Sequence, residues 1–344
     1  CQCQTFLHAR LPRTNCPAHG VKQIVAPWGE PRSQFTRLLE SRVIDTLREC
    51  DVTGVTRLMG TSWEETWGLM TRAVMRGLAR KEKRVCARIG IDEKSLGKGH
   101  DYESIVCDLD RGTVEYVVDD RKQESLESYY RQFTREELAA IEAIAMDMWE
   151  PYIAATKAYV PDADNKIVFD RYHATTQVTK AVDKVRRREH KVLAKQGDLR
   201  LLGTKYLWLR NEENVPEWRR EEFDGVKNAE LKTSRAWAIK ESLRVFWNYV
   251  YAKCAGKYFK AWYFWATHSR LEPIIEAAKT LKRHIANIMT YFKHRITNAT
   301  SEGINSKIQT IKLMACGYRN REHYKTAIYF HCGGLDLYPR AGAT

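Results

Sequence analysis

The stretch from residue 85 to residue 170 constrains the fold most, because the spacing of its apolar residues changes repeatedly. Short apolar or alternating runs, bounded by turn residues, predict strands at 85–92, 103–108, 112–118, 141–146 and 166–170. Helical spacing predicts helices over 124–133 and 135–140, after Pro151, and directly after residue 170. The order is three strands in a meander, then helix, strand, helix, strand and helix. It predicts an α/β domain with a mixed sheet.

Acidic residues lie where these elements end or begin. Asp92 ends the first strand, Asp147 follows the fourth, and Glu302 lies in the first turn of a later helix that Asn298 or Thr300 can cap. The strand order is that of a ribonuclease-H-like domain, whose first and fourth strands are neighbours. Three converging carboxylates would hold Mg²⁺ or Mn²⁺ for phosphoryl transfer on nucleic acid.

Each acid also has an ordinary interpretation, because acids are common in loops. Glu93 and Asp170 likewise lie beside predicted strand ends. Asp170 competes with Asp147 as the second acid, and we favour Asp147 because it follows the fourth strand.

Asp170 and His173 are three residues apart at a strand–helix junction and share one face. We expect them to support the metal site rather than bind the metal, and the alternative is local hydrogen bonding at the sheet edge. Three cations, Lys94, Lys307 and Arg319, are candidates to neutralise charge on a phosphate.

The charge balance indicates a polyanionic partner. The chain carries 57 Lys and Arg against 43 Asp and Glu, a net charge of +14, and nucleic acid is the usual partner of such a surface. A basic protein with no nucleic-acid role is the alternative. Apolar stretches end well before ~18 residues, so no membrane partner is expected. Nine scattered cysteines without disulfide-like spacing favour a reducing cytoplasm.

Residues 1–32 contain half of a zinc site. Cys16 and His19 stand in the order Cys-x-x-His, which provides two of the four ligands of a structural zinc ion. Cys1 and Cys3 are too close together to form a comfortable second pair, so an unmetallated segment is an equal alternative. The chain opens on Cys1 without Met, and we interpret it as a fragment.

Residues 33–82 have the rhythm of a helix-turn-helix. A short helix over 53–59 is followed by Gly60 and by a second helix that the capping box of Ser62 and Glu65 opens. Trp63, Trp67, Met70 and Val74 recur at helical spacing on the second helix. Arg72 and Arg76 are expected on its exposed side, where they would enter a DNA major groove. The alternative is a plain helical hairpin.

Residues 83–185 are predicted to form the first part of the catalytic core. Residues 186–295 predict an all-helical insertion, after which residues 296–344 return to the catalytic core. Basic residues alternate there with tryptophans, which either stack on unpaired bases near a DNA end or fill the core of the insertion. The tryptophans of this segment are Trp208, Trp218, Trp237, Trp247, Trp262 and Trp265. For most of them we favour a place in the core.

Five sequence blocks together resemble the bacterial insertion-sequence transposases of the ISL3 family, over nearly the whole chain. The blocks are Ile91-Asp92-Glu93 with Lys98-Gly99-His100, residues 146–152, residues 169–173, residues 300–307 and residues 317–320. The resemblance implies an Asp-Asp-Glu site of Asp92, Asp147 and Glu302, and matches Asp170 and His173 to an Asp-x-x-His signature.

The same resemblance implies a zinc ribbon, a helix-turn-helix that reads terminal inverted repeats of double-stranded DNA, and oligomers acting on paired ends. It also implies a bacterial, nucleoid-associated protein. The first zinc-binding pair of the family would lie upstream of Cys16 and outside this chain.

Three hypotheses for function follow. The first is a Mg²⁺-dependent DNA transposase. The second is a DNA-binding relic without activity, and the third is a structure-specific nuclease that uses the same site.

Overall fold

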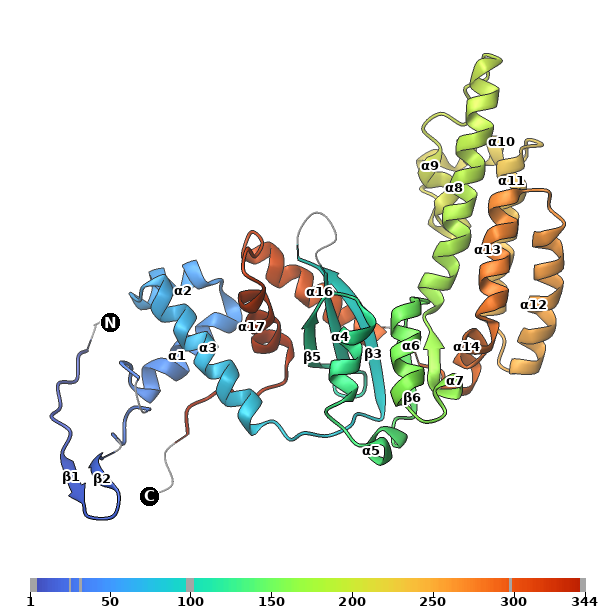
Figure 1. The fold of residues 1–344 in the computed structure, drawn as a ribbon. Helices are drawn as coiled ribbons and strands as arrows, with labels where there is room; N and C mark the ends of the chain where they lie inside the picture. The colour runs from blue at the N-terminus through green and yellow to red at the C-terminus, as the bar shows by residue number, and fades with distance from the viewer. Residues whose placement is uncertain (1–4, 25, 31–32, 97–101, 297–298, 341–344) are drawn as a thin grey trace. The chain divides into compact units, whose positions relative to one another are not determined.

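A mixed sheet of five strands carries the predicted meander and the two strands that follow it. The computed structural model describes residues 5–24, 26–30, 33–96, 102–296 and 299–340. The strand order is β5-β4-β3-β6-β7 (Figure 1). The strands are β3 (Arg88–Ser95), β4 (Tyr102–Asp108), β5 (Thr113–Asp119), β6 (Ala143–Met146) and β7 (Ile167–Phe169). The predicted α/β fold class and the neighbouring first and fourth strands are thereby confirmed.

The strand boundaries differ from the predicted ones by up to three residues, and one of these differences concerns the candidate site. The strand β3 begins at Arg88 and continues through Asp92 to Ser95, so Asp92 lies within the strand rather than at its end. Backbone pairing defines a strand, and it continues here through the polar residues Glu93, Lys94 and Ser95, where an apolar pattern stops.

Two compact units make up the chain. The first contains residues 1–84, 93–120 and 300–344, and the second contains residues 85–92 and 121–299. Strands β4 and β5 belong to the first unit and β6 and β7 to the second, while β3 contributes residues to both. The division of the chain into five parts remains a prediction.

The first unit contains the predicted helix-turn-helix. Its helices are α1 (Arg37–Glu49), α2 (Val52–Met59) and α3 (Trp63–Arg80). Gly60 ends α2 with a left-handed φ of 68°, and Ser62 and Glu65 form the capping box that opens α3. Both predicted signals are confirmed, because only glycine reaches that φ without cost and the box pairs two helix-end amides.

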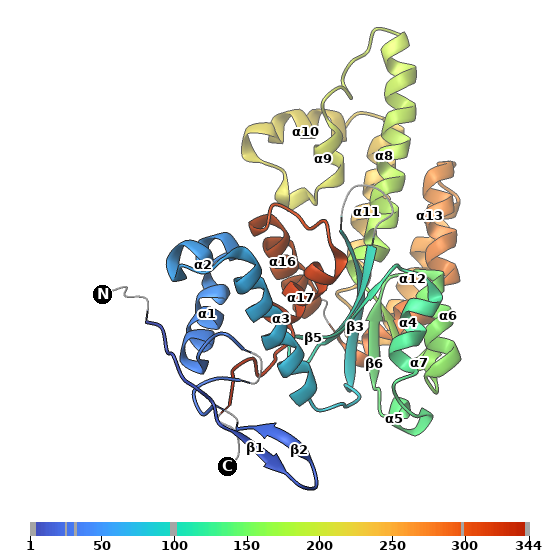
Figure 2. The same cartoon turned by 60° about the vertical axis from the view of Figure 1, so that its left-hand side comes forward.

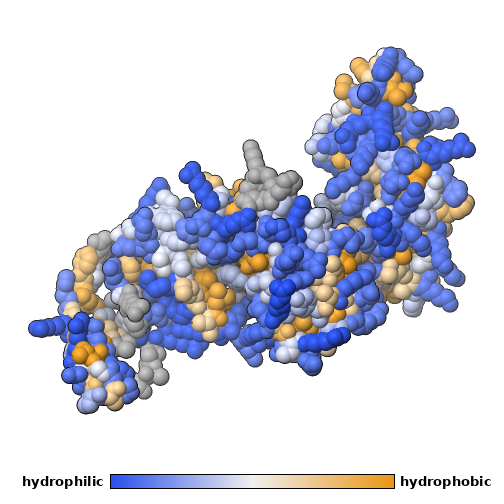
Figure 3. All heavy atoms as spheres, viewed as in Figure 1, coloured by the Kyte–Doolittle hydropathy of each residue, from blue (hydrophilic) through white to orange (hydrophobic). Residues whose placement is uncertain are grey.

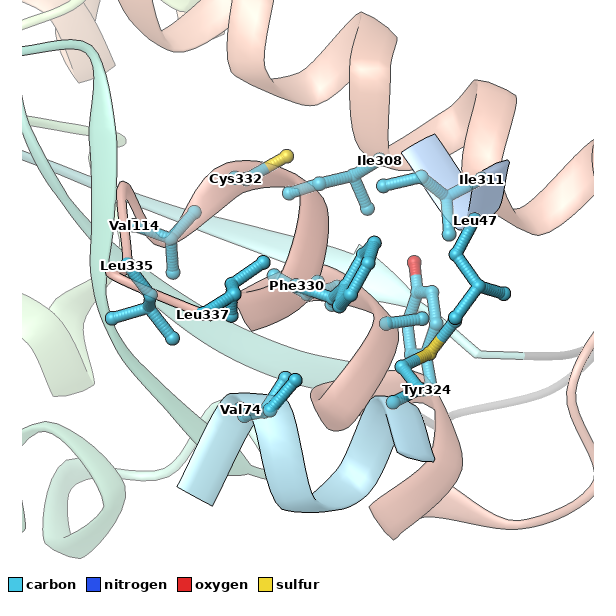
Figure 4. Packing of buried hydrophobic residues seen from close by; sticks show 14 of the residues in the cluster. Leu47, Val74, Val114, Ile308, Ile311, Tyr324, Phe330, Cys332, Leu335 and Leu337 are labelled. Atoms are coloured by element: carbon cyan, nitrogen blue, oxygen red, sulfur yellow. The ribbon is translucent and has the colours of Figure 1, made fainter. Parts of the chain in front are cut away.

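One hydrophobic core holds the first unit together. Figure 4 shows side chains from α1, α3, β5, α16 (Ala299–Met314) and α17 (Arg321–Cys332) meeting around Phe330. Val74 and Leu47 bring the helix-turn-helix into this core, and Leu335 and Leu337 bring the segment after α17. Segments more than 200 residues apart in sequence are therefore stabilised together.

The N-terminal residues of the first unit form a two-stranded hairpin of β1 (Arg13–Cys16) and β2 (Gly20–Gln23) (Figure 2). Cys1 and Cys3 lie outside the described residues. No helix in the described ranges is both long enough and apolar enough to span a bilayer.

The second unit places helices around β6 and β7 and continues into a helical region. The helices before the region are α4 (Gln123–Tyr130), α5 (Arg135–Ala139), α6 (Glu150–Tyr159) and α7 (Ala163–Lys166). The region itself consists of α8 (Arg171–Lys195), α9 (Lys205–Leu209), α10 (Arg220–Lys227), α11 (Lys232–Phe246), α12 (Ala252–Thr267), α13 (Glu272–Arg283), α14 (Ile285–Met289) and α15 (Tyr291–His294).

The long helix α8 crosses the predicted boundary of the insertion at residue 186 without a break, and α11 and α13 pack against it (Figure 2). Most tryptophans fill the core of this region, as we favoured: Trp208, Trp237, Trp247 and Trp262 are buried. Trp218 and Trp265 are the exposed exceptions.

The helix α3 packs closely against the segment after α17, and two of its glycines test this contact. A Cβ atom at Gly77 would lie 2.6 Å from the Cβ of Leu335, whereas at Gly68 the nearest atom would be 3.8 Å away. We expect Gly77→Ala to lower the free energy of unfolding by about 1–3 kcal/mol through overpacking. Gly68→Ala should raise it by up to ~1 kcal/mol through helix propensity. Urea unfolding measures both, and equal effects of the two changes would contradict this packing.

A buried glutamate makes the stability of the first unit depend on pH. Burial, and then the charge of Asp119, raise the pKa of Glu103 to about 8, although Arg321 Nη1 lies 3.2 Å from its carboxylate. The folded state therefore binds a proton that the unfolded state has released, and stability falls as pH rises from about 4.5 to about 8.

We expect Glu103→Gln to remove this pH dependence. Relative to wild type, the free energy of unfolding of the variant should increase by a few kcal/mol between pH 5 and pH 8, since one pKa unit corresponds to ~1.4 kcal/mol. Urea-unfolding midpoints from pH 5 to pH 8 measure it. Glu115→Gln is the matched control, since Glu115 pairs with Lys81 Nζ at 2.9 Å. A stability difference between Glu103→Gln and wild type that is constant with pH would contradict the assignment.

Candidate active site

The register of three parallel strands lines up three aspartates. In β3 and β6, Gly90 pairs with Ala145, and in β6 and β7, Met146 pairs with Phe169. Continuing both registers places Asp92 level with Asp147, and Asp147 level with Asp170. Neighbouring strands are ~4.8 Å apart, so the three residues form one row, with Asp92 within β3 and Asp147 and Asp170 directly after the carboxyl ends of β6 and β7.

The carboxylates in this row are close enough to share a cation. Ligand oxygens of Asp92, Glu93 and Asp147 all lie within 4.8 Å of one another. The side chain of Asp147 is 18% exposed. Like charges at this distance disfavour simultaneous ionisation unless a cation or a proton joins them.

His173 supplies a partner for the row from the first turn of α8. Its Nε2 lies 2.9 Å from Asp147 Oδ1 and 3.8 Å from Asp170 Oδ2. Asp170 itself caps α8, because its Oδ1 accepts a hydrogen bond from the backbone N–H of Tyr172 at 2.9 Å. The cap fixes the start of the helix and hence the direction in which His173 points.

The electrostatics of the site favour added positive charge. Burial raises the pKa of Asp147, and this outweighs the lowering by the hydrogen bond from His173. Burial alone would lower the pKa of His173, but the hydrogen bond and charge of Asp147, with the charges of Asp170 and Asp92, raise it overall. The charges of Asp92 and Asp170 contribute to the raised pKa of both groups.

The donor set fits a hard divalent cation. Three carboxylates offer only oxygen ligands, which Mg²⁺ and Mn²⁺ prefer, and the nearby imidazole is already engaged by Asp147. Asp92, Glu93 and Asp147 are thus the residues that could hold such an ion. Asp170 and His173 hold the surrounding geometry.

Glu93 is the site residue that sequence reasoning missed. It was treated as an ordinary acid beside a strand end, because acids are common in loops. Its only sequence signal is its position directly after Asp92.

The other predicted catalytic residues lie in the first unit. Glu302 and Lys307 are exposed on α16, with Glu302 in its first turn as predicted. Arg319 is exposed between α16 and α17, and Lys94 is half-buried in β3. The structure therefore brings together Asp92, Asp147, Asp170 and His173, whereas the place of Glu302 beside them remains a prediction. Asn298 and the Lys98-Gly99-His100 block lie outside the described residues.

The prediction that Arg76 is exposed on α3 is wrong. Its side chain is 9% exposed and forms ion pairs with the buried Glu40 and with Glu30. It also donates to the carbonyl of Leu337. A guanidinium held in this way cannot reach into a groove without breaking buried ion pairs. Arg72 is half-buried on the same helix.

The candidate zinc ligands are adjacent. Cys16 Sγ lies 3.3 Å from His19 Nδ1, at the turn of the β1–β2 hairpin. In the part of the chain that the structure describes, no cluster of three or more metal-binding side chains includes either residue. Zinc binding remains a prediction.

Comparisons with known proteins identify a family. A family model described as "Transposase" (DDE_Tnp_ISL3) matches residues 89–328. A second model, the helix-turn-helix domain of transposase family ISL3, matches residues 26–74.

Named relatives point the same way. The transposase for insertion sequence element IS1557 of Mycobacterium tuberculosis is 26% identical, over 92% of this chain and 76% of that protein. The transposase for insertion sequence element IS1001 of Bordetella parapertussis is 26% identical, over 93% of this chain and 80% of that protein. The family model covers most of the chain, including the row of aspartates, and the chain therefore belongs to the ISL3 family of transposases.

Proposed function

We propose that this protein is a DNA transposase that cuts insertion-sequence ends and joins the freed 3′ ends to target DNA by metal-dependent phosphoryl transfer. The observation that carries the proposal is that Asp92 in β3 lies level with Asp147 after the adjacent parallel strand β6, with His173 within hydrogen-bond distance of Asp147. The family model and the two named relatives support it.

In this proposal Asp92, Asp147 and Glu302 bind Mg²⁺ or Mn²⁺, and Glu93 is a further carboxylate beside Asp92 and Asp147. Bound divalent ions would lower the pKa of the attacking hydroxyl and stabilise charge on the leaving oxygen. The protein holds the proposed ligands rigidly. Asp92 lies in β3 and Asp147 directly follows the paired strand β6, and the side chain of His173 holds the Asp147 carboxylate in one orientation. Lys94, Lys307 and Arg319 are the proposed cations for the phosphate.

The proposed partner is double-stranded DNA, read at terminal inverted repeats by the helix-turn-helix, with homo-oligomers acting on paired ends. Arg72 remains a proposed DNA contact, whereas the buried ion pairs of Arg76 assign it to the packing of α3. A nuclease using the same site would cut without joining, so the strand-joining product separates the two functions. A relic would bind DNA without cutting.

Cleavage of a supercoiled plasmid carrying the element's own ends tests the proposal. With Mg²⁺ or Mn²⁺ we expect nicking at the ends and joined products from wild type. Asp92→Ala, Asp147→Ala and Glu302→Ala should fall below detection, because each removes a proposed metal ligand.

Asp170→Ala is the comparison within the row, and we expect it to keep activity within about 10–100-fold of wild type, as for a residue outside the ligand set. Activity lost in Asp170→Ala but kept in Asp147→Ala would exchange their roles. Gel shifts on the same variants separate loss of cutting from loss of binding.

Removing the imidazole tests the supporting role of His173. We expect His173→Ala to lower the cleavage rate about 10–100-fold and to raise the Mn²⁺ concentration needed for half-maximal rate. His173→Gln should recover part of the loss, since an amide can still donate to Asp147. His268→Ala, an exposed histidine in the same unit, is the control. A His173→Ala enzyme with unchanged metal dependence would show that the histidine does not act through the metal ligands.

A further inference from the structure

A groove along α8 carries positive charge, and none of the three aspartates of the row lines it. It has a volume of about 560 Å³ and lies between α8, α9 and α13, all within the second unit. Five cations and three carboxylates line it. The cations are Lys180, Lys184, Arg187, Arg188 and Lys205, and the carboxylates are Asp183, Glu272 and Glu276.

Most of the negative charge in the groove is already neutralised. Asp183 accepts from Arg186 at 2.8 Å and from Arg187 at 3.1 Å. Glu276 accepts from Lys279 at 3.2 Å. Among the residues that the structure describes, Lys180, Lys184, Arg188 and Lys205 form no ion pair, and all four are exposed. The groove therefore presents an unbalanced positive surface.

The spacing of these cations works against the helix that carries them. Lys180, Lys184 and Arg188 follow one another at i, i+4 and i+8, so like charges lie on successive turns. Each such pair destabilises a helix by about 0.2–0.5 kcal/mol. The opposite side of α8 is buried through Val178, Val182 and Val185, which holds the three cations outward. An ordinary solvated face would alternate signs at this spacing, whereas a polyanion would relieve the repulsion.

We propose that this groove binds the phosphate backbone of duplex DNA beyond the scissile phosphate, an inference that rests on the proposed function. The helix α8 starts at the row of aspartates, and at 1.5 Å per residue Lys180 lies about 10 Å and Arg188 about 22 Å along it from His173. The three cations thus span about 12 Å, the rise of three to four base pairs. Hydrophilic side chains cover most of the visible face of this helical region (Figure 3).

The salt dependence of DNA binding tests this assignment. The probe is a fluorescein-labelled 40-base-pair duplex of arbitrary sequence, bound by the full chain in EDTA, with anisotropy read at several KCl concentrations. The test variant is Lys180→Ala/Lys184→Ala/Arg188→Ala. The control, Lys253→Ala/Lys257→Ala/Lys260→Ala, removes the same charge from exposed lysines of α12 in the same region.

We expect the slope of log K against log salt to fall by about 2–3 in the test variant, because each phosphate contact contributes ~0.9. Affinity at 0.15 M salt should fall at least roughly ten-fold below that of the control. Lys184→Glu, a single change at an exposed position, should weaken binding in the same direction and guards against a triple variant that fails to fold.

Equal slopes and affinities for the test and control variants would overturn the proposal, as would a wild-type chain that does not bind the duplex even at 50 mM KCl. Failure of the proposed function can be distinguished from failure of the groove assignment, because cutting and binding are measured separately. Asp92→Ala should bind with the wild-type slope, and a wild-type chain that binds through the groove but never cuts would refute the function and leave the groove assigned.

Discussion

The in-register parallel pairing of β3, β6 and β7 is the constraint on which the site depends. Ile89 opposite Ile144 and Ala145 opposite Val168 fix the register inside a buried sheet. A slip by one residue would exchange the faces of every side chain in the slipped strand and take its aspartate out of line with the other two. The hydrophobic effect thereby sets the positions of Asp92, Asp147 and Asp170, although none of them is apolar.

The row then depends on how α8 leaves the sheet. Asp170 directly follows the last residue of β7 and caps α8, so the strand passes into the helix without a loop. His173 reaches Asp147 because of that direct junction. The same helix continues for 25 residues and carries the cations of the groove. The helix α8 thus carries both His173 of the candidate active site and the cations of the proposed DNA-binding groove.

Local signals in the sequence predicted much of this structure. The strand order, the turn at Gly60 and the capping box of Ser62 and Glu65 depend on residues near one another in sequence, and all were predicted. The proximity of Asp92 and Asp147 followed from the strand order. The exposed side of α3 could not be predicted from the sequence. Periodicity separates the apolar face of a helix from its polar face, but it does not show that Glu40 and Leu337 bind Arg76 on the polar face. Glu93 was missed because an acid beside a strand end is common in loops.

The central claim is that Asp92, Asp147 and Glu302 bind the same divalent ions. Fe²⁺ in place of Mg²⁺, with ascorbate and peroxide, cuts a polypeptide backbone close to where the ion is bound, and mass spectrometry locates the cuts. We expect fragments that end near residues 92, 147 and 302, all suppressed by excess Mg²⁺. Cuts near residues 92 and 147 without any near residue 302 would contradict the claim.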